Sequence, residues 1–172
     1  MRDIDSFQSS FVTYEGELGD AMVHPEIKKF IDFGSSVFKT LKIVTNGGVR
    51  TPNFYKSLGD TYRNLEIMFS IDGLEDETNQ KYRRKVITKK AYDNMIAYKN
   101  SKYEKVSWQY VIFEHNWFEI PEILQIAKNH MIPIELKINA RPKFRVKNKL
   151  IPYIVDLFEK NKFKQSNLVL AN

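Results

Sequence analysis

Five short apolar segments, each followed by a polar turn and a stretch with helical periodicity, constrain this chain more than any other feature of its sequence. The segments are Phe11–Tyr14, Leu41–Val44, Leu65–Ile71, Ser107–Phe113 and Ile134–Ile138. Strands that alternate with helices of about ten to fifteen residues form βαβ units, and the right-handed crossovers of such units make neighbouring strands parallel. The pattern therefore predicts an α/β fold with a mostly parallel sheet.

Alternation within the segments indicates how helices cover that sheet. Mostly polar side chains take every second position in the third and fifth segments, at Glu66, Ser70 and Asp72 and at Glu135, Lys137 and Asn139. A parallel sheet with helices on both faces is apolar on both. One polar face therefore favours a partial (β/α) barrel over a flat sheet, with helices on the outside only and the polar face lining a chamber.

Composition limits the class of protein. With 172 residues, 42% of them hydrophobic, the chain has the length of one domain and enough apolar residues for a core. No run of about eighteen apolar residues predicts a membrane span, and no basic-then-apolar opening predicts a signal peptide, so we expect a cytoplasmic protein. The absence of cysteine excludes disulfides, thiolate metal sites and a cysteine nucleophile. His24, His115 and His130 are scattered, so no histidine metal site is predicted.

The net charge of +6 comes from the C-terminal part of the chain. Residues 141–172 hold 8 of the 27 basic residues and 2 of the 21 acidic ones, which accounts for the whole excess. We therefore expect two parts: a neutral partial barrel over residues 1–140, and a basic connector with a C-terminal helix over residues 141–172 that packs on it. A basic run of this kind is more often a solvated connector than a nucleic-acid-binding face.

The polar turns, taken in order, resemble those of the radical S-adenosylmethionine superfamily. The matching stretches are GEL followed by HPEI, then TNGG, then FSIDGL followed by KYRR, then Asn116 with EI, spanning about Phe11 to Pro142. The chain is similar in particular to members with a C-terminal auxiliary-cluster (SPASM/twitch-like) domain and to homologues from marine phage and metagenomes. The resemblance implies an open six-strand (β/α) barrel, whose first strand leads in the family into a CxxxCxxC loop that holds an iron–sulfur cluster.

Five units without cysteine resemble strands two to six of that barrel, with the CxxxCxxC unit absent. The complete enzyme would bind S-adenosylmethionine and cleave it reductively to a 5′-deoxyadenosyl radical, which abstracts hydrogen from a substrate. Iron–sulfur clusters need thiolates from the protein, so this chain is not expected to ligate the cluster or to be active alone. We therefore expect a split-gene half, a truncated reading frame or a fragment, and a separate N-terminal half as one partner.

Gly16 and Glu17 match the glycine–glutamate motif of the family, which resembles a clamp for the methionyl amine of the cofactor. The glycine lets a ligand approach the backbone, and a carboxylate neutralises an ammonium group. Ligands of barrels also bind just beyond the carboxyl ends of strands. The alternative interpretation is a strand-end turn with a solvated glutamate.

Four further residues resemble cofactor-binding positions. Ser70 and Asp72 would hydrogen-bond the ribose or carboxylate of the cofactor, Asn116 the cofactor or neighbouring backbone, and Arg141 a carboxylate or phosphate. Three of them have a structural alternative: Asp72 and Asn116 as caps, and Arg141 as a surface residue. Thr45-Asn46-Gly47 favours a structural turn with positive φ. No catalytic residue and no metal ligand is assigned.

Two rival interpretations stay open. The acidic positions Glu15, Glu17, Asp72 and Glu135 would suit a barrel enzyme that uses Mg²⁺ or acid–base chemistry. The chain would otherwise be a non-catalytic binding module that keeps the fold with a decayed site. The substrate is not predicted, because in the family it is set by loops and C-terminal additions.

Overall fold

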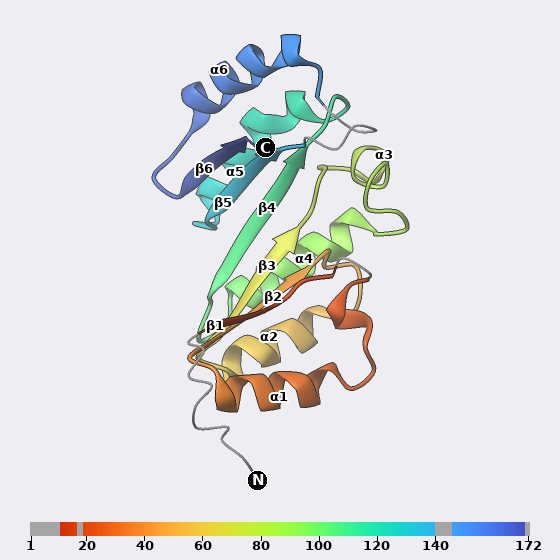
Figure 1. The fold of residues 1–172 in the computed structure, drawn as a ribbon, viewed down its shortest axis with the longest axis vertical. Helices are drawn as coiled ribbons and strands as arrows, with labels where there is room; N and C mark the ends of the chain where they lie inside the picture. The colour runs from red at the N-terminus through yellow and green to blue at the C-terminus, as the bar shows by residue number, and fades with distance from the viewer. Residues whose placement is uncertain (1–10, 17–18, 140–145, 171–172) are drawn as a thin grey trace.

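A computed structural model describes residues 11–16, 19–139 and 146–170 and shows one six-stranded sheet (Figure 1). The strands are β1 (Phe11–Tyr14), β2 (Thr40–Thr45), β3 (Leu65–Ser70), β4 (Val106–Ile112), β5 (Ile134–Ile138) and β6 (Ser166–Leu170). Their order in the sheet is their order in the chain, and every neighbouring pair is parallel. The predicted α/β fold with a mostly parallel sheet is therefore confirmed, and β1 lies at one edge of the sheet.

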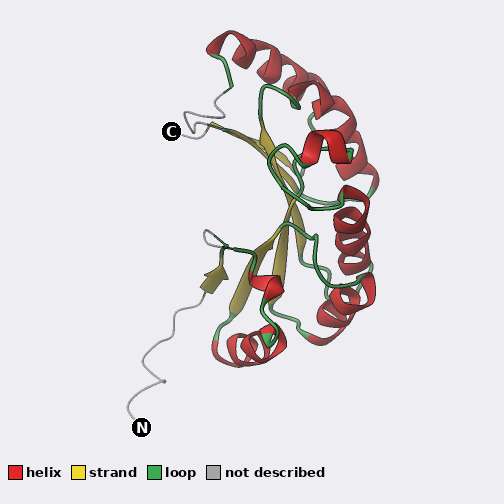
Figure 2. Cartoon of the chain, turned by 90° about the vertical axis from the view of Figure 1, so that its right-hand side faces the viewer, coloured by secondary structure: helices red, strands yellow, loops and turns green. Residues whose placement is uncertain are grey.

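The helices lie along one face of the sheet, which curves so that they cover its convex side (Figure 2). They are α1 (Ile27–Val37), α2 (Pro52–Thr61), α3 (Asp76–Asn79), α4 (Thr88–Lys99), α5 (Ile120–Asn129) and α6 (Ile151–Asn161), with 3₁₀ turns at Ala21–Val23, Trp117–Glu119 and Asn148–Leu150. A proline in the first turn of α2, α5 and α6 starts each helix with its φ already fixed. The concave face carries no helix among the described residues, which confirms the partial barrel.

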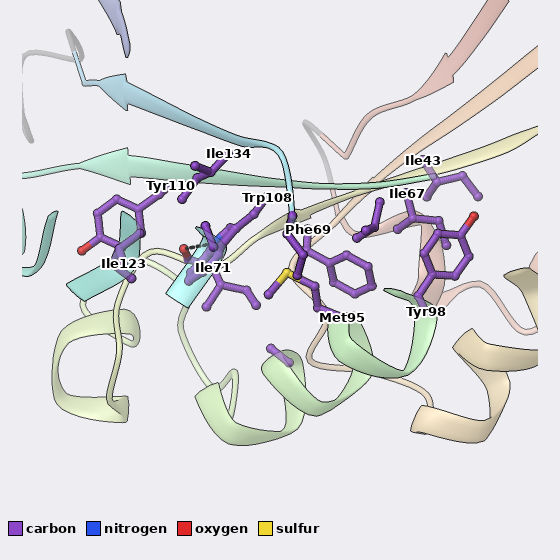
Figure 3. Close-up of a cluster of buried hydrophobic side chains, with 14 of the residues drawn as sticks. Ile43, Ile67, Phe69, Ile71, Met95, Tyr98, Trp108, Tyr110, Ile123 and Ile134 are labelled. Carbon is purple, nitrogen blue, oxygen red and sulfur yellow. Dashed lines mark hydrogen bonds between the residues drawn. The ribbon is translucent and has the colours of Figure 1, made fainter. Parts of the chain in front are cut away.

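The core lies between the sheet and the helices, and the predicted alternation of the strands produces it. Leu65, Ile67 and Phe69 of β3 are fully buried, whereas Glu66 and Met68 between them are partly exposed. The strands β4 and β5 repeat this pattern. Figure 3 shows part of the core, in which strand residues meet side chains of α4 and α5: Ile67, Phe69, Trp108, Tyr110, Met95, Tyr98 and Ile123. Burying each such side chain stabilises the fold by about 1.5–3 kcal/mol.

Helices α2 and α4 pack closely because the contact contains a glycine. A Cβ built on Gly59 of α2 would lie 1.8 Å from the Ser101 hydroxyl oxygen and 3.1 Å from the Tyr98 ring. Tyr98 in turn donates its hydroxyl to the Leu65 carbonyl of β3 at 2.9 Å. The glycine therefore allows α4 to approach both α2 and the sheet.

The strand β6 was not predicted from the sequence, which indicated only a basic connector and a C-terminal helix over residues 141–172. Ser166 pairs with Ile134, and the register continues to Leu170 beside Ile138. Ser166 also closes the turn before the strand, because its hydroxyl accepts a hydrogen bond from the Phe163 N–H at 2.8 Å. The helix α6 packs on α5 and returns the chain to the open edge of β5, where a short segment gains a full ladder of backbone hydrogen bonds.

None of the helices in the described part of the chain is long and apolar enough to cross a membrane.

Candidate functional site at the carboxyl ends of the strands

The loop after β1 folds back tightly on itself at Gly16. A Cβ built on this residue would lie 1.9 Å from the Gly19 carbonyl oxygen, so only a glycine fits here without a shift of the loop. Gly16 is exposed, in keeping with a position that a ligand can approach. Two other predicted site residues, Glu17 and Arg141, lie outside the described residues.

Asp20 joins this loop to the end of β2, and the sequence analysis did not single it out. One carboxylate oxygen accepts the Met22 N–H at 2.9 Å, which caps a 3₁₀ turn. The other accepts the Thr45 hydroxyl at 2.8 Å and the Asn46 N–H at 2.7 Å. The local signal was an aspartate directly before the start of a turn, whereas its bond to Thr45 depends on the tertiary fold.

The turn at the end of β2 is held by hydrogen bonds within the protein. The Asn46 side chain accepts the Gly48 N–H at 2.8 Å, and Gly47 has a φ of 71°. The buried Asn94 of α4 donates to the carbonyls of Gly47 at 2.8 Å and Val49 at 3.2 Å. These bonds give the Thr45-Asn46-Gly47 stretch a structural role, as its composition predicted.

Asp72 lies just beyond β3 with its carboxylate fully buried. One oxygen accepts the Val111 N–H of β4 at 2.7 Å, and the other accepts Arg83 Nε at 2.6 Å. Burial raises the pKa of Asp72, whereas the Arg83 guanidinium and the Val111 N–H act in the opposite direction by stabilising the anion. This geometry connects β3, β4 and the segment before α4.

Asn116 lies beside Asp72 and is also fully buried. Its amide nitrogen donates to the carbonyls of Asp72 and Val111, both at 2.9 Å, and its oxygen accepts the Phe113 N–H at 2.6 Å. The structure therefore brings two of the predicted site residues together. Their contacts with the main chain fix the shape of the strand ends around the site.

Glu119 and Tyr110 form a buried pair next to these residues that the sequence analysis missed. The Tyr110 hydroxyl donates to Glu119 Oε2 at 2.7 Å, and the Leu74 N–H donates to the same oxygen at 3.2 Å. Burial and the carboxylate raise the pKa of Tyr110, so the phenol stays protonated as a donor. The pair connects β4 and the start of α5 to the loop after β3.

Ser70 belongs to a polar row that crosses the concave face of the sheet. Its hydroxyl donates to Gln109 Oε1 of β4 at 3.3 Å, and Gln109 Nε2 donates to Glu135 Oε1 of β5 at 3.3 Å. The strand register places Asn167 of β6 next to Glu135. Gln109 and Glu135 are partly exposed. Ser70 is only 2% exposed, so the row presents mainly amide and carboxylate groups, which can hydrogen-bond an uncharged polar ligand or a cationic one.

The acidic residues proposed for the Mg²⁺ alternative do not share one environment. Glu15 is exposed after β1, Asp72 is buried and paired with Arg83, and Glu135 lies on the concave face. Within the described residues, no group of three or more His, Cys, Asp or Glu side chains is arranged to hold a metal ion.

Comparison with known proteins finds a structural likeness. No protein-family model matches the sequence, and no curated protein matches it. A solved structure of a histidine-tagged protein, described as "anSMEcpe with bound AdoMet", matches with a TM-score of 0.60 at 15% sequence identity. The match covers 88% of this chain and 42% of that one, so this chain spans less than half of its length. At this identity, what the two proteins are shown to share is the fold of an open α/β barrel.

Proposed function

We propose that this chain supplies the S-adenosylmethionine-binding portion of a radical S-adenosylmethionine enzyme. The proposal rests on the agreement between a sequence resemblance and a structural match. The ordered turns GEL, TNGG, FSIDGL and Asn116 resemble those of the superfamily, and the fold matches a protein with bound AdoMet over 88% of this chain. The concave polar face, open in the described residues, gives such a cofactor a place to bind.

The residues present suit the cofactor, each by its own chemistry. Glu17 would neutralise the methionyl amine, with Gly16 allowing close approach, and Ser70 would hydrogen-bond the ribose or carboxylate. Arg141 would hold a carboxylate. Asp72 and Asn116 would act by positioning the strand ends, since hydrogen bonds within the protein engage their side chains.

When bound and reduced, S-adenosylmethionine supplies a 5′-deoxyadenosyl radical for hydrogen abstraction. The residues of this sequence do not fit the iron–sulfur cluster that reduces it, because the chain contains no cysteine. Cluster ligands would have to come from outside this sequence, and we assign the present chain only binding and shielding of the cofactor.

We place a cysteine-bearing partner segment next to β1, at the edge of the sheet. The Tyr62 hydroxyl at the end of α2 donates to Asp32 of α1, which identifies the flank of α1 that faces α2. At 100° per residue, Phe30 and Phe33 fall on the opposite flank, and they are 47% and 57% exposed. An edge strand beside an apolar helix flank suits the addition of one more βα unit.

Isothermal titration calorimetry of the purified chain with S-adenosylmethionine tests the proposal. We expect weak, saturable binding and no cofactor cleavage, because no cluster is ligated. A charge-assisted hydrogen bond contributes about 1.5–3 kcal/mol, so Glu17→Gln should weaken binding by roughly tenfold to a hundredfold. Glu15→Gln is the matched control and should matter less. A folded chain that binds no S-adenosylmethionine would overturn the proposal. Equal affinities of the parent and Glu17→Gln would show that Glu17 does not bind the methionyl amine.

The absence of cysteine also favours a second candidate, a module that binds S-adenosylmethionine without radical chemistry. Co-expression with a cysteine-bearing segment encoded next to this chain separates the two. Complex formation with cofactor cleavage supports the enzyme portion, whereas binding by this chain with no cleavage in the mixture supports the module.

A further inference from the structure

A cavity of about 430 Å³ lies on the convex side of the molecule, away from the polar concave face. It is bounded by the loop after β3, the start of α4, the strand β4 and the helix α5. In the helix layer, α4 packs on α2 and α5 packs on α6, so the cavity falls between two pairs of helices. Its volume lies within the range of about 300–1,000 Å³ that is typical of small-molecule sites.

Two aromatic rings and several aliphatic side chains form the walls of the cavity. Trp108 is 1% exposed, and its indole N–H donates to the Ile71 carbonyl at 2.9 Å, which fixes the ring. The Tyr92 ring lies 6.3 Å from the Trp108 ring at an angle of 66°. Ile126 of α5 lines the cavity, and Ile87, at its rim, is 54% exposed. Tyr92, Ile126 and Ile87 are at least partly exposed, so an apolar body that packs on them would remove water from their surfaces.

The charged side chains that line the cavity are mostly acidic. They are the carboxylates of Glu75, Asp76 and Glu122 and one ammonium group, that of Lys89. Lys89 is 2.7 Å from the Asp93 carboxylate, so a neighbouring acid already compensates its charge. The ion pairs found among the described residues include none of the three lining carboxylates. Asp76 accepts the backbone N–H of Thr88, which also lines the cavity, at 2.7 Å. Acidic groups therefore outnumber basic ones in the lining, and the carboxylates of Glu75 and Glu122 take part in none of the hydrogen bonds or ion pairs found among the described residues.

We propose that this cavity binds an organic cation, an ammonium or guanidinium group on an apolar stem. Aromatic faces attract such cations, and carboxylates stabilise them by charge-assisted hydrogen bonds. The aliphatic walls suit the stem, and the three carboxylates disfavour an anion of the same shape. A free amine and a lysine or arginine side chain of a peptide present the same chemistry. The site is separate from the proposed cofactor face and does not depend on that function.

Tryptophan fluorescence can follow binding at this cavity directly. The chain has two tryptophans, so Trp117→Phe leaves Trp108 as the single reporter. Hexylammonium, hexanol and hexanoate are probes with the same apolar stem and different charges. In the Trp117→Phe protein, we expect saturable binding of hexylammonium, about tenfold weaker binding of hexanol and none of hexanoate.

Variants test whether the signal comes from the proposed groups. Glu122→Gln should weaken hexylammonium binding by about threefold to tenfold, and Ile126→Phe should abolish it by filling the cavity. Glu77→Gln is the matched control, because Glu77 is an exposed acid of α3 that does not line the cavity. Circular dichroism verifies that each variant is folded. Equal affinities for hexylammonium and hexanol, or binding unchanged by Glu122→Gln or Ile126→Phe in folded protein, would overturn the proposal.

A second set of probes separates the two sources of the cation. Nα-acetyl-lysine methylamide and a short lysine-centred peptide carry the same side chain with different amounts of backbone. Tighter binding of the peptide assigns the cavity to a basic segment of a partner protein. Tighter binding of hexylammonium than of either assigns it to a free amine, and both results support recognition of an organic cation.

Discussion

The carboxylate of Asp72, just beyond the end of β3, accepts the backbone N–H of Val111 in β4 at 2.7 Å. Its other oxygen accepts Arg83 Nε at 2.6 Å. A fully buried carboxylate thus connects two neighbouring strands to the segment between α3 and α4. This side chain therefore helps to hold the ends of β3 and β4, where the proposed cofactor site lies, in their relative position.

Arg83→Gln should therefore destabilise the fold strongly. Removing one partner leaves a buried charge uncompensated, which costs about 3–5 kcal/mol. The loss is measured as a change in the free energy of unfolding by urea. The double variant Asp72→Asn with Arg83→Gln should recover part of it, because no buried charge remains, and a double variant as unstable as Arg83→Gln would contradict this explanation.

The cost of Arg83→Gln should also depend on pH. Without the guanidinium, burial raises the pKa of Asp72 above its ordinary value near 4 with less opposition. The folded variant then binds a proton more readily than the unfolded chain, so its stability falls as pH rises through this range. The difference between parent and variant should be smaller at about pH 4 than at about pH 8, and urea unfolding at both values checks this. An equal difference at the two values would argue against ionisation of Asp72 in the variant.

Asn116→Ala should cost about 2–4 kcal/mol, because it leaves a buried carbonyl, a partly buried carbonyl and a buried N–H without their partner. Asn129→Ala at the exposed end of α5 is the control and should change the free energy of unfolding by about 0.5 kcal/mol or less. Thermal or urea unfolding measures both. Similar small losses in the two variants would show that the buried amide contributes little.

Gly59→Ala should destabilise the protein although alanine favours helices by about 1 kcal/mol. The added methyl group would lie 1.8 Å from the Ser101 hydroxyl oxygen and 2.6 Å from its Cβ. We expect a net loss of about 1–3 kcal/mol from overpacking. Adding Ser101→Gly should remove the clash, so the two changes should be non-additive in a double-mutant cycle of unfolding free energies. Strict additivity would mean that the helices separate freely at this contact.

Tyr62 should make stability fall at high pH. Burial, followed by its hydrogen bond to the Asp32 carboxylate, raises the pKa of Tyr62 from its ordinary value of 10.0 to about 12. The protonated phenol makes its full contribution to the free energy of unfolding below about pH 10. This contribution is lost as pH rises through the pKa that Tyr62 has in the folded protein. The stability of the parent relative to Tyr62→Phe should therefore decline above about pH 10. Urea unfolding between about pH 8 and pH 11.5 tests this, and a constant difference would contradict the shift.

The sequence predicted most strands because their signal is local. Alternation over Leu65–Ile71 anticipates β3, and the same alternation anticipates which face the helices cover. The strand β6 escaped because Ser166–Leu170 has two polar residues followed by three consecutive apolar ones, which is not an alternating pattern. What makes it a strand is the free edge of β5, which is a property of the assembled sheet.

The site was predictable to a similar extent. Ser70 and Asp72 were placed on one face by counting along a strand, and they lie at the end of β3 as expected. The partners of Ser70 and Asp72, Gln109 and Arg83, could not be predicted, because they follow from strand register and from a loop conformation. Asp20 is a similar case, since its bond to Thr45 crosses from one strand end to the next.

The sequential strand order has a consequence for how the chain is made. Every strand pairs only with its neighbours in the sequence, from β1 with β2 to β5 with β6. A doubly wound sheet, by contrast, reverses its strand order and must add later strands on both sides of earlier ones. Here each βα unit can pair with the edge strand of the units synthesised before it. Synthesis proceeds at about 5–20 residues per second. Because each strand pairs with a strand that precedes it in the chain, the first three strands can be folded while β6 is still being translated.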